Sequence, residues 1–156
     1  MEDKYDSYEE EEILIIRIHK GKHPINMVTT YGKQESGEVG VKEEIVQQIN
    51  LWEQIIIEMQ RKEGHVLWIG DLNVKIGNDD RGIAGNHPEV MHGDRMLRKL
   101  TKERDLQLIN ATEKCTGLWT SINTWKKDEK SILDYVITSR KMTEKIQMMH
   151  IDKEGL

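Results

Sequence analysis

This chain of 156 residues has no phenylalanine, only one cysteine and two prolines, and no long apolar run. Aliphatic residues, four Trp and eight Met must therefore build the core. The single Cys115 excludes an internal disulfide framework and favours a reducing compartment. No apolar run approaches membrane-spanning length, and the acidic start at residues 1–4 is unlike a secretory or mitochondrial signal. We expect a soluble, intracellular protein without a membrane partner, and the choice between nucleus and cytoplasm stays open.

Positive net charge is also missing. The formal charge is −5 and the sequence pI is about 5.7, which does not provide the electrostatic attraction of a tight nucleic-acid binder. An enzyme that visits a phosphodiester can still use a local basic patch and a bound cation. The length favours one domain with a sizeable core.

The first half of the chain alternates between strand and helix patterns. Residues 1–12 are polar and acidic and are expected to be disordered-like. Residues 13–18 and 25–31 are β-prone and predict an antiparallel hairpin. The period becomes helical over residues 42–62. Its apolar stripe consists of Ile45, Ile49, Trp52, Ile56 and Met59.

The second half supplies further strands, so that residues 13–156 read as one layered α/β domain. We expect the helix over 42–62 to lie on one face of a single mixed sheet. The strands of that sheet are predicted at 13–18, 25–31, 66–71, 106–110 and 132–138. Other expected features are a long loop over 77–93, a hairpin bracketed by Trp119 and Trp125, and a helix over 141–149. We also expect a short helix that Asp94 caps and that turns Met96, Leu97 and Leu100 inward.

The most informative stretch follows the apolar run Val66–Ile69, which reads as a buried strand. Gly70 ends the run, and Asp71 and Asn73 should project to the same face because residues at i and i+2 do so on an extended chain. A carboxylate beside an amide suits a phosphate, a metal or a water. A turn in which both side chains satisfy local backbone groups is an equally good explanation of this tetrapeptide alone.

Four segments together resemble a known family. Tyr31 ends the predicted hairpin, Trp68–Asn73 reads WIGDLN, residues 117–120 read GLWT, and residues 131–135 read SILDY. In this order and spacing they resemble the endonuclease/exonuclease/phosphatase superfamily, and most closely the apurinic-type endonuclease domain of non-LTR retrotransposons. The resemblance begins near Glu11, covers the middle and later part of the family domain, and implies a partial layered α/β sandwich.

The resemblance implies specific roles. Tyr31 would bind the phosphate that is cut, and Asp71 would align or deprotonate the attacking water. Asn73 would contact the same phosphate and steady the nucleophile. Asp134 would orient a catalytic imidazole through a carboxylate hydrogen bond. Trp119 would be a structural neighbour of the site.

The resemblance also implies parts that this sequence does not supply. The family opens with strands that carry an Asn and a metal-binding Glu, and it closes with Ser-Asp-His. His150 is not preceded by Ser-Asp, so we do not match it to the catalytic His. Asp71 with Asn73 offers few ligands for the Mg²⁺ that the family uses, and the metal ligands stay unassigned. Because the family's second sheet is partly built from the opening strands, we expect apolar surface to be exposed here.

Three functions stay open. We favour an Mg²⁺-dependent endonuclease-type domain of retrotransposon origin, acting on DNA or another phosphodiester and weakly active or inactive as this chain. The alternatives are a non-catalytic remnant or interaction module, and a phosphatase of small phosphate esters. Basic residues could contact a phosphate backbone or form a solvated face; these are Lys33, Arg95 and Arg98. The remaining histidines lack ligand spacing and are expected on the surface or in loops; these are His19, His23, His65, His87 and His92.

Overall fold

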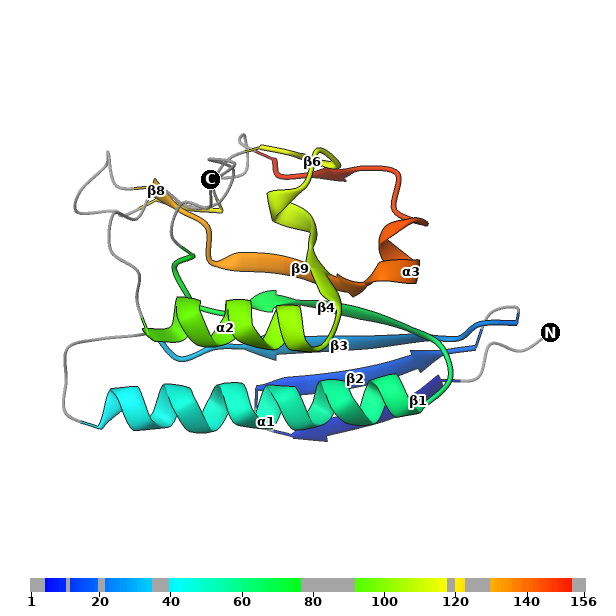
Figure 1. Ribbon diagram of the computed structural model, residues 1–156, viewed down its shortest axis with the longest axis horizontal. Coiled ribbons are helices and arrows are strands. Elements are labelled where there is room, and N and C mark those ends of the chain that lie inside the picture. The colour runs from blue at the N-terminus through cyan, green and yellow to red at the C-terminus, as the bar shows by residue number, and fades with distance from the viewer. Residues whose placement is uncertain are drawn as a thin grey trace.

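A mixed six-stranded sheet with two helices on one face forms the body of the protein (Figure 1). The computed structural model describes residues 5–10, 12–19, 22–34, 40–76, 92–117, 120–122 and 130–152. The strand order is β1-β2-β3-β4-β9-β5. The predicted α/β class and the single mixed sheet are confirmed.

The strands of the sheet are β1 (Tyr5–Glu10), β2 (Ile13–Ile18), β3 (Ile25–Tyr31), β4 (His65–Asp71), β5 (Leu106–Leu108) and β9 (Asp134–Ser139). The helices are α1 (Val41–Arg61), α2 (His92–Glu103), the single turn α3 (Arg140–Thr143) and the 3₁₀ helix η1 (Ile109–Ala111). Two small ladders complete the described elements: β6 (Cys115–Thr116) pairs in parallel with β10 (Met149–His150), and β7 (Ser121–Ile122) pairs in antiparallel with β8 (Lys130–Ser131). None of the described helices has the length and apolar character needed to cross a membrane.

The core lies between α1, α2 and the sheet. The five apolar residues predicted for the stripe of α1 are all buried. Trp52 from this stripe meets Trp68 of β4 edge to face, with ring centroids 5.4 Å apart. The indole N–H of Trp68 donates to Oγ1 of Thr30 over 2.8 Å, which ties β4 to β3 inside the core. Burial of each such apolar side chain contributes roughly 1.5–3 kcal/mol to the stability of the fold, so this layer packs the helices firmly onto the sheet.

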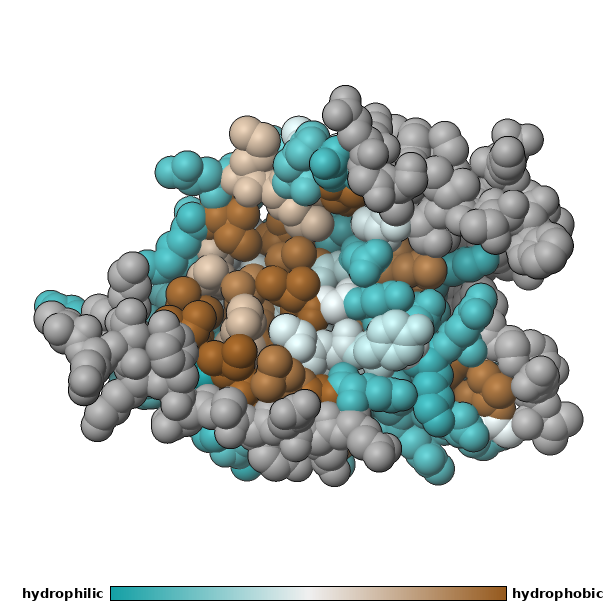
Figure 2. Space-filling model, turned by 180° about the vertical axis from the view of Figure 1, so that it is seen from behind, coloured by the Kyte–Doolittle hydropathy of each residue, from teal (hydrophilic) through white to brown (hydrophobic). Residues whose placement is uncertain are grey.

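The opposite side of the sheet is apolar and partly exposed, and we call it the open face. Figure 2 shows hydrophobic side chains gathered over the middle of this side. Strand alternation assigns the residues, because Val28 and Trp68 point into the helix-covered core and their neighbours point away from it. The open face consists of Leu14, Ile16, Met27, Leu67, Ile69 and Val136. Ile69 is 37% exposed, so the prediction of exposed apolar surface is confirmed.

The N-terminal prediction is wrong for residues 5–10. These residues form β1, which pairs along its whole length with β2. The apolar strand β2 offers an unpaired backbone edge, and pairing with that edge overrides the unfavourable composition of YDSYEE.

The predicted ends of several elements also shift. The helix expected over 141–149 ends at Thr143, because the ammonium of Lys114 binds the carbonyls of Thr143 and Ile146 and the chain then joins β10. The strand expected over 106–110 ends at Leu108, where η1 begins, and the strand expected over 132–138 begins at Asp134.

Two further predictions concern the loops and α2. Asp94 does not cap α2 but lies in its first turn, buried and paired with Arg98. Leu97 and Leu100 are buried as expected. A strand pair is present near residue 120, but its second strand, β8, lies at Lys130–Ser131, beyond the Trp125 that was expected to bracket the hairpin. Trp119, Trp125 and the loop over residues 77–91 lie outside the described residues.

Candidate active site

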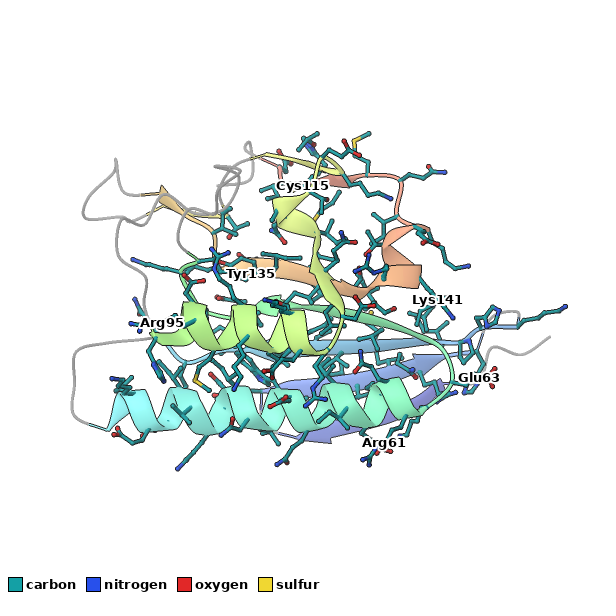
Figure 3. The ribbon with its side chains drawn as sticks, in the orientation of Figure 1. Arg61, Glu63, Arg95, Cys115, Tyr135 and Lys141 are labelled. Carbon is teal, nitrogen blue, oxygen red and sulfur yellow. The ribbon has the colours of Figure 1, made fainter. Side chains whose placement is uncertain are left out.

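Three predicted side chains stand in one row across the sheet. Asp71 in β4 is the register partner of Tyr31 in β3 and of Asp134 in β9. Register partners project from the same side of a sheet, and here that side is the open face. Figure 3 shows Tyr135, which follows Asp134, at the same end of the molecule as Arg95, with Lys141 at the other end. The structure therefore brings together three of the four residues proposed from the sequence.

The end of β3 and the turn after β4 approach each other very closely. The N–H of Gly32 donates to the carbonyl of Asp71 over 2.7 Å. A Cβ atom on Gly32 would lie 2.0 Å from the carbonyl oxygen of Leu72, and one on Gly70 would lie 2.0 Å from that of Thr30. Since neither overlap can be relieved without moving backbone, both positions require glycine.

Asn73 joins this row through a tight turn. Its φ of 50° is in the left-handed region, which asparagine tolerates better than most residues. Its backbone N–H donates to Oδ1 of Asp71 over 3.0 Å, and its side-chain amide donates to the carbonyl of Gly32 over 2.7 Å. The turn explanation of the GDLN sequence is confirmed, whereas the extended-chain reason for a shared face is wrong, because β4 ends at Asp71 and Asn73 has a left-handed φ. Asn73 reaches Asp71 through the turn, and the functional explanation stays a prediction. The second N–H of the Asn73 amide remains for another acceptor.

The surroundings of Asp71 change the pKa of its carboxyl group. Its carboxyl is half-buried, and this burial raises its pKa above the ordinary value. The backbone N–H of Asn73 acts in the opposite direction, and the nearby carboxylate of Asp134 raises the pKa further. A carboxylate with a raised pKa is a stronger base, which suits the alignment or deprotonation of a water.

The tyrosine of the LDY segment is structural. Tyr135 is buried, and its hydroxyl lies 2.7 Å from the carbonyls of both Val74 and Ile132. The same oxygen accepts the N–H of Ile76 over 3.3 Å. Burial raises the pKa of Tyr135, so the phenol stays neutral. It fastens the chain that follows Asn73 to the turn that precedes β9.

Two side chains outside the predicted set contact the backbone of Asp134. Asn110 in η1 donates to its carbonyl, and Thr120 accepts its N–H. No sequence signal marked Asn110, which fell within a predicted strand. Thr120 was part of the GLWT segment but had no assigned role.

The three basic residues singled out in the sequence differ in their surroundings. Lys33 pairs with Glu44 over 3.1 Å, and Arg98 pairs with Asp94 over 2.6 Å. Arg95 is exposed in the first turn of α2. A cavity of about 240 Å³ opens where the end of β3 meets α1, and its lining includes Tyr31, Gln47, Gln48 and Leu51. Because α1 covers the other side of the sheet, this cavity does not belong to the open face. Tyr31 itself is 56% exposed.

The described residues offer few ligands for Mg²⁺. Among them, no three His, Cys, Asp or Glu side chains are grouped so that they could hold a metal ion. Oδ1 of Asp71 is already engaged with Asn73. Magnesium prefers near-octahedral coordination by oxygen atoms and is often bound through one or two carboxylates, with waters and phosphate oxygens completing the shell. The described residues would therefore supply only part of its coordination.

Comparison with known proteins finds similar folds among solved structures. No protein-family model and no curated protein matches this chain. Among solved structures it resembles the endonuclease domain of TRAS1, a telomere-specific non-LTR retrotransposon, with a TM-score of 0.62 and 16% identity over 90% of this chain and 58% of that one. It also resembles the 3′–5′ exonuclease NExo from Neisseria meningitidis, with a TM-score of 0.66 and 12% identity over 90% of this chain and 57% of that one.

A third similar structure is β toxin from Staphylococcus aureus with bound magnesium ions, with a TM-score of 0.51 and 14% identity over 82% of this chain and 42% of that one. Another NExo structure, described as a 3′ phosphatase, is bound to a product DNA hairpin. The chain thus spans about half the length of the structures that it matches. At these identities the likeness concerns the fold, and the fold of this chain is of the endonuclease/exonuclease/phosphatase type.

Proposed function

We propose that this chain is a phosphodiester hydrolase-type domain, of the endonuclease kind found in non-LTR retrotransposons, with weak or no activity of its own. The observation that carries the proposal is the row of Tyr31, Asp71 and Asp134 with Asn73 at its edge. A row of polar side chains at one end of a buried sheet contributes little to packing. It matches, residue by residue, the positions that the family resemblance assigns to catalysis.

The chemistry of the row suits the first part of a hydrolysis. Asp71, with its raised pKa, holds a water and accepts its proton. The Tyr31 hydroxyl and the remaining N–H of the Asn73 amide donate to oxygens of the phosphate. Asp134 extends the acidic character of the site toward β9. The substrate class is a phosphodiester, with DNA as the first choice.

Weak activity follows from what the described residues do not supply. Charge that develops on the phosphate needs a cation or several preorganised donors, and removing one such donor commonly costs on the order of 10²–10³ in rate. No metal cluster is found among residues 5–152 where they are described. Water alignment and two phosphate contacts do not replace that contribution.

The first experiment measures cleavage. Purified chain with Mg²⁺ is incubated with supercoiled plasmid, with an abasic-site duplex and with a 3′-phosphorylated oligonucleotide. We expect product at or near background, and the same for Asp71→Ala. Strong metal-dependent nicking that Asp71→Ala abolishes would contradict the weak activity. Release of phosphate alone would favour the phosphatase alternative.

The second experiment tests the site independently of turnover. NMR spectra are recorded while a dinucleoside monophosphate is added in the presence of Mg²⁺. We expect the largest shifts at Gly32, Asp71 and Asn73, and we expect Asn73→Ala to remove them. The control is Asp105→Asn, which changes an exposed carboxylate beside Arg140, past the far end of β9, and should leave the shifts intact. Shifts confined to other regions would contradict the proposed site.

The open face supports a second candidate, a non-catalytic interaction module. Exposed contiguous apolar surface commonly marks an interaction site, and Ile69 is the most exposed member of this face. A chain that remains monomeric and binds no hydrophobic dye would count against this candidate.

A further inference from the structure

We propose that Asn110 and Thr120 are positioning residues that fix the backbone of Asp134 at its carbonyl and at its N–H, and so hold its carboxylate beside Asp71. The catalytic importance of this arrangement rests on the proposed function. The arrangement itself is a structural property that can be tested whether or not the chain cleaves a substrate.

Thr120 binds the backbone at the start of β9. Its hydroxyl oxygen accepts the N–H of Leu133 over 2.9 Å and that of Asp134 over 3.1 Å. A hydroxyl has two lone pairs, so one side chain satisfies both donors. The carbonyl of Leu133 in turn accepts the N–H of Leu72, in the turn between Asp71 and Asn73. Thr120 therefore fixes the point at which Asp134 enters the sheet.

Asn110 acts from the β5 side. Backbone pairing between β5 and β9 stops at Leu108 opposite Ile137, because the chain then turns into η1. The Asn110 amide continues the ladder, since Nδ2 donates to the carbonyl of Asp134 over 3.0 Å and Oδ1 accepts the N–H of Val136 over 2.9 Å. These two groups lie on the same edge of β9, as the partners of a neighbouring strand would.

The strength of this attachment comes from burial. Asn110 is only 3% exposed, so its amide has little access to water as a substitute partner. Breaking either bond would leave a poorly solvated polar group, which costs about 1–3 kcal/mol. Asn110 is therefore a rigid support and not an interchangeable surface contact.

Asp134 needs such support because its position is unfavourable. It stands opposite Asp71, and like charges directly opposite each other destabilise a sheet. Its exposed carboxylate forms no hydrogen bond or ion pair with the described residues that could hold it there. Its position therefore depends on its backbone, which Asn110 and Thr120 hold at the carbonyl and the N–H, in addition to the pairing of β9 with β4.

The test follows the carboxyl of Asp71 by NMR as pH is varied. Asp134→Asn should lower the pKa of Asp71, because a neighbouring negative charge is removed. Thr120→Val and Asn110→Ala should lower it in the same direction, because Asp134 is free to move away. Thr120→Ser keeps the accepting oxygen and should restore the wild-type titration.

A matched control separates positioning from general stability. Thr143→Val removes the buried hydroxyl contact with Thr138, 2.7 Å long, near the other end of β9. It should lower the midpoint of urea unfolding but leave the titration of Asp71 unchanged. An unchanged Asp71 titration in folded Thr120→Val and Asn110→Ala would overturn the proposal.

A measurement on the wild-type chain keeps the proposal testable if these variants do not fold. The amides of Leu133 and Asp134 should exchange with solvent as slowly as the ladder amides of β9, because Thr120 accepts both. Exchange at the rate of an exposed loop would overturn the role of Thr120. Loss of this protection in Thr120→Val, with recovery in Thr120→Ser, would support it. Absence of DNA cleavage affects neither result.

Discussion

Asp71 and Asp134 stand opposite each other across β4 and β9, although both carry carboxylates. The pair raises the pKa of the more buried member, Asp71, whose burial already disfavours its charge. A sheet selected for stability alone would place unlike or apolar side chains here. The pair is therefore an unfavourable feature of the sheet, and the proposed function would account for it.

Removing the charge of Asp71 should stabilise the protein at neutral pH. The folded state keeps the proton of Asp71 to a higher pH than the unfolded state does, because the pKa is raised above 3.8. The stability that this group contributes is fully present below pH 3.8 and is lost as the pH rises through the pKa of Asp71 in the folded state. Asp71→Asn keeps an oxygen that can accept the N–H of Asn73, and it should raise the midpoint of urea unfolding at pH 7. This increase should vanish below pH 3.8.

Asp105 provides the matched control with the opposite sign. Arg140 lowers the pKa of Asp105 by a hydrogen bond and by its charge. The stability from this pair is present above the ordinary pKa and lost as pH falls through the folded one. Asp105→Asn should therefore lower the urea midpoint at pH 7, because the pair with Arg140 is lost. The decrease should be small, because both side chains are exposed. A lower midpoint for Asp71→Asn at pH 7 would contradict the cost assigned to the site.

His65 should make the fold sensitive to mild acid. Burial lowers its pKa, and the charges of Lys145, His23 and Lys141 lower it further. The unfolded state therefore binds a proton more readily, so the stability linked to His65 is complete above pH 6.5 and falls as pH drops toward the folded pKa. Both ring nitrogens are buried without a partner among the described residues.

The acid sensitivity can be measured by urea unfolding between pH 7 and pH 5. Wild-type stability should fall over this range, and His65→Phe should flatten the part of the slope that comes from this residue. Lys145→Gln should flatten it partially, because one nearby positive charge is removed. A slope that is identical in His65→Phe and wild type would show that other groups carry the acid response.

The open face should account for most binding of a hydrophobic dye. Ile69→Lys places a charge at its most exposed position and should reduce dye fluorescence and any concentration-dependent association. Leu51→Lys is a well-matched control, because Leu51 is 40% exposed on α1, on the opposite side of the sheet from Ile69. Equal reductions in both variants would show that the dye does not discriminate between the two sides.

The sequence was sufficient for the parts of the fold that repeat a simple pattern. The apolar stripe of α1 and the β2–β3 hairpin follow from periodicity, because each buries one regular face. Strand-end reasoning placed Tyr31, Asp71 and Asp134 together, and their shared register agrees with it. Whether these residues act on a phosphodiester remains a prediction.

The rest depended on contacts that the local sequence does not encode. Residues 5–10 form β1 because β2 offers an edge, and the helix after Ser139 is short because Lys114, far away in the chain, binds its carbonyls. His65 was expected at the surface but is only 6% exposed. Asn110 could not be recognised, because its role exists only where the β5 backbone leaves the sheet.

Asn73 offers the sharpest test of how the turn and the site share residues. Its φ of 50° costs most residues about 1 kcal/mol that glycine avoids. The hydrogen bond from its side-chain amide to the carbonyl of Gly32, 2.7 Å long, adds about 1 kcal/mol to the stability of the native protein. Because asparagine already tolerates this φ, Asn73→Gly gains no backbone relief and loses only the hydrogen bond, whereas Asn73→Ala loses the hydrogen bond and takes on the backbone cost. Urea unfolding should therefore rank wild type above Asn73→Gly, and Asn73→Ala about 1 kcal/mol lower still.

Ligand binding should not follow that ranking. If Asn73 donates to the phosphate, Asn73→Gly and Asn73→Ala should lose the shifts caused by a dinucleoside monophosphate to the same extent, because both lack the amide. Asn73→Asp should lose them too, since a carboxylate cannot donate to a phosphate oxygen and adds a third negative charge beside Asp71. Binding that instead rises and falls with stability across the three variants would assign Asn73 to the turn alone.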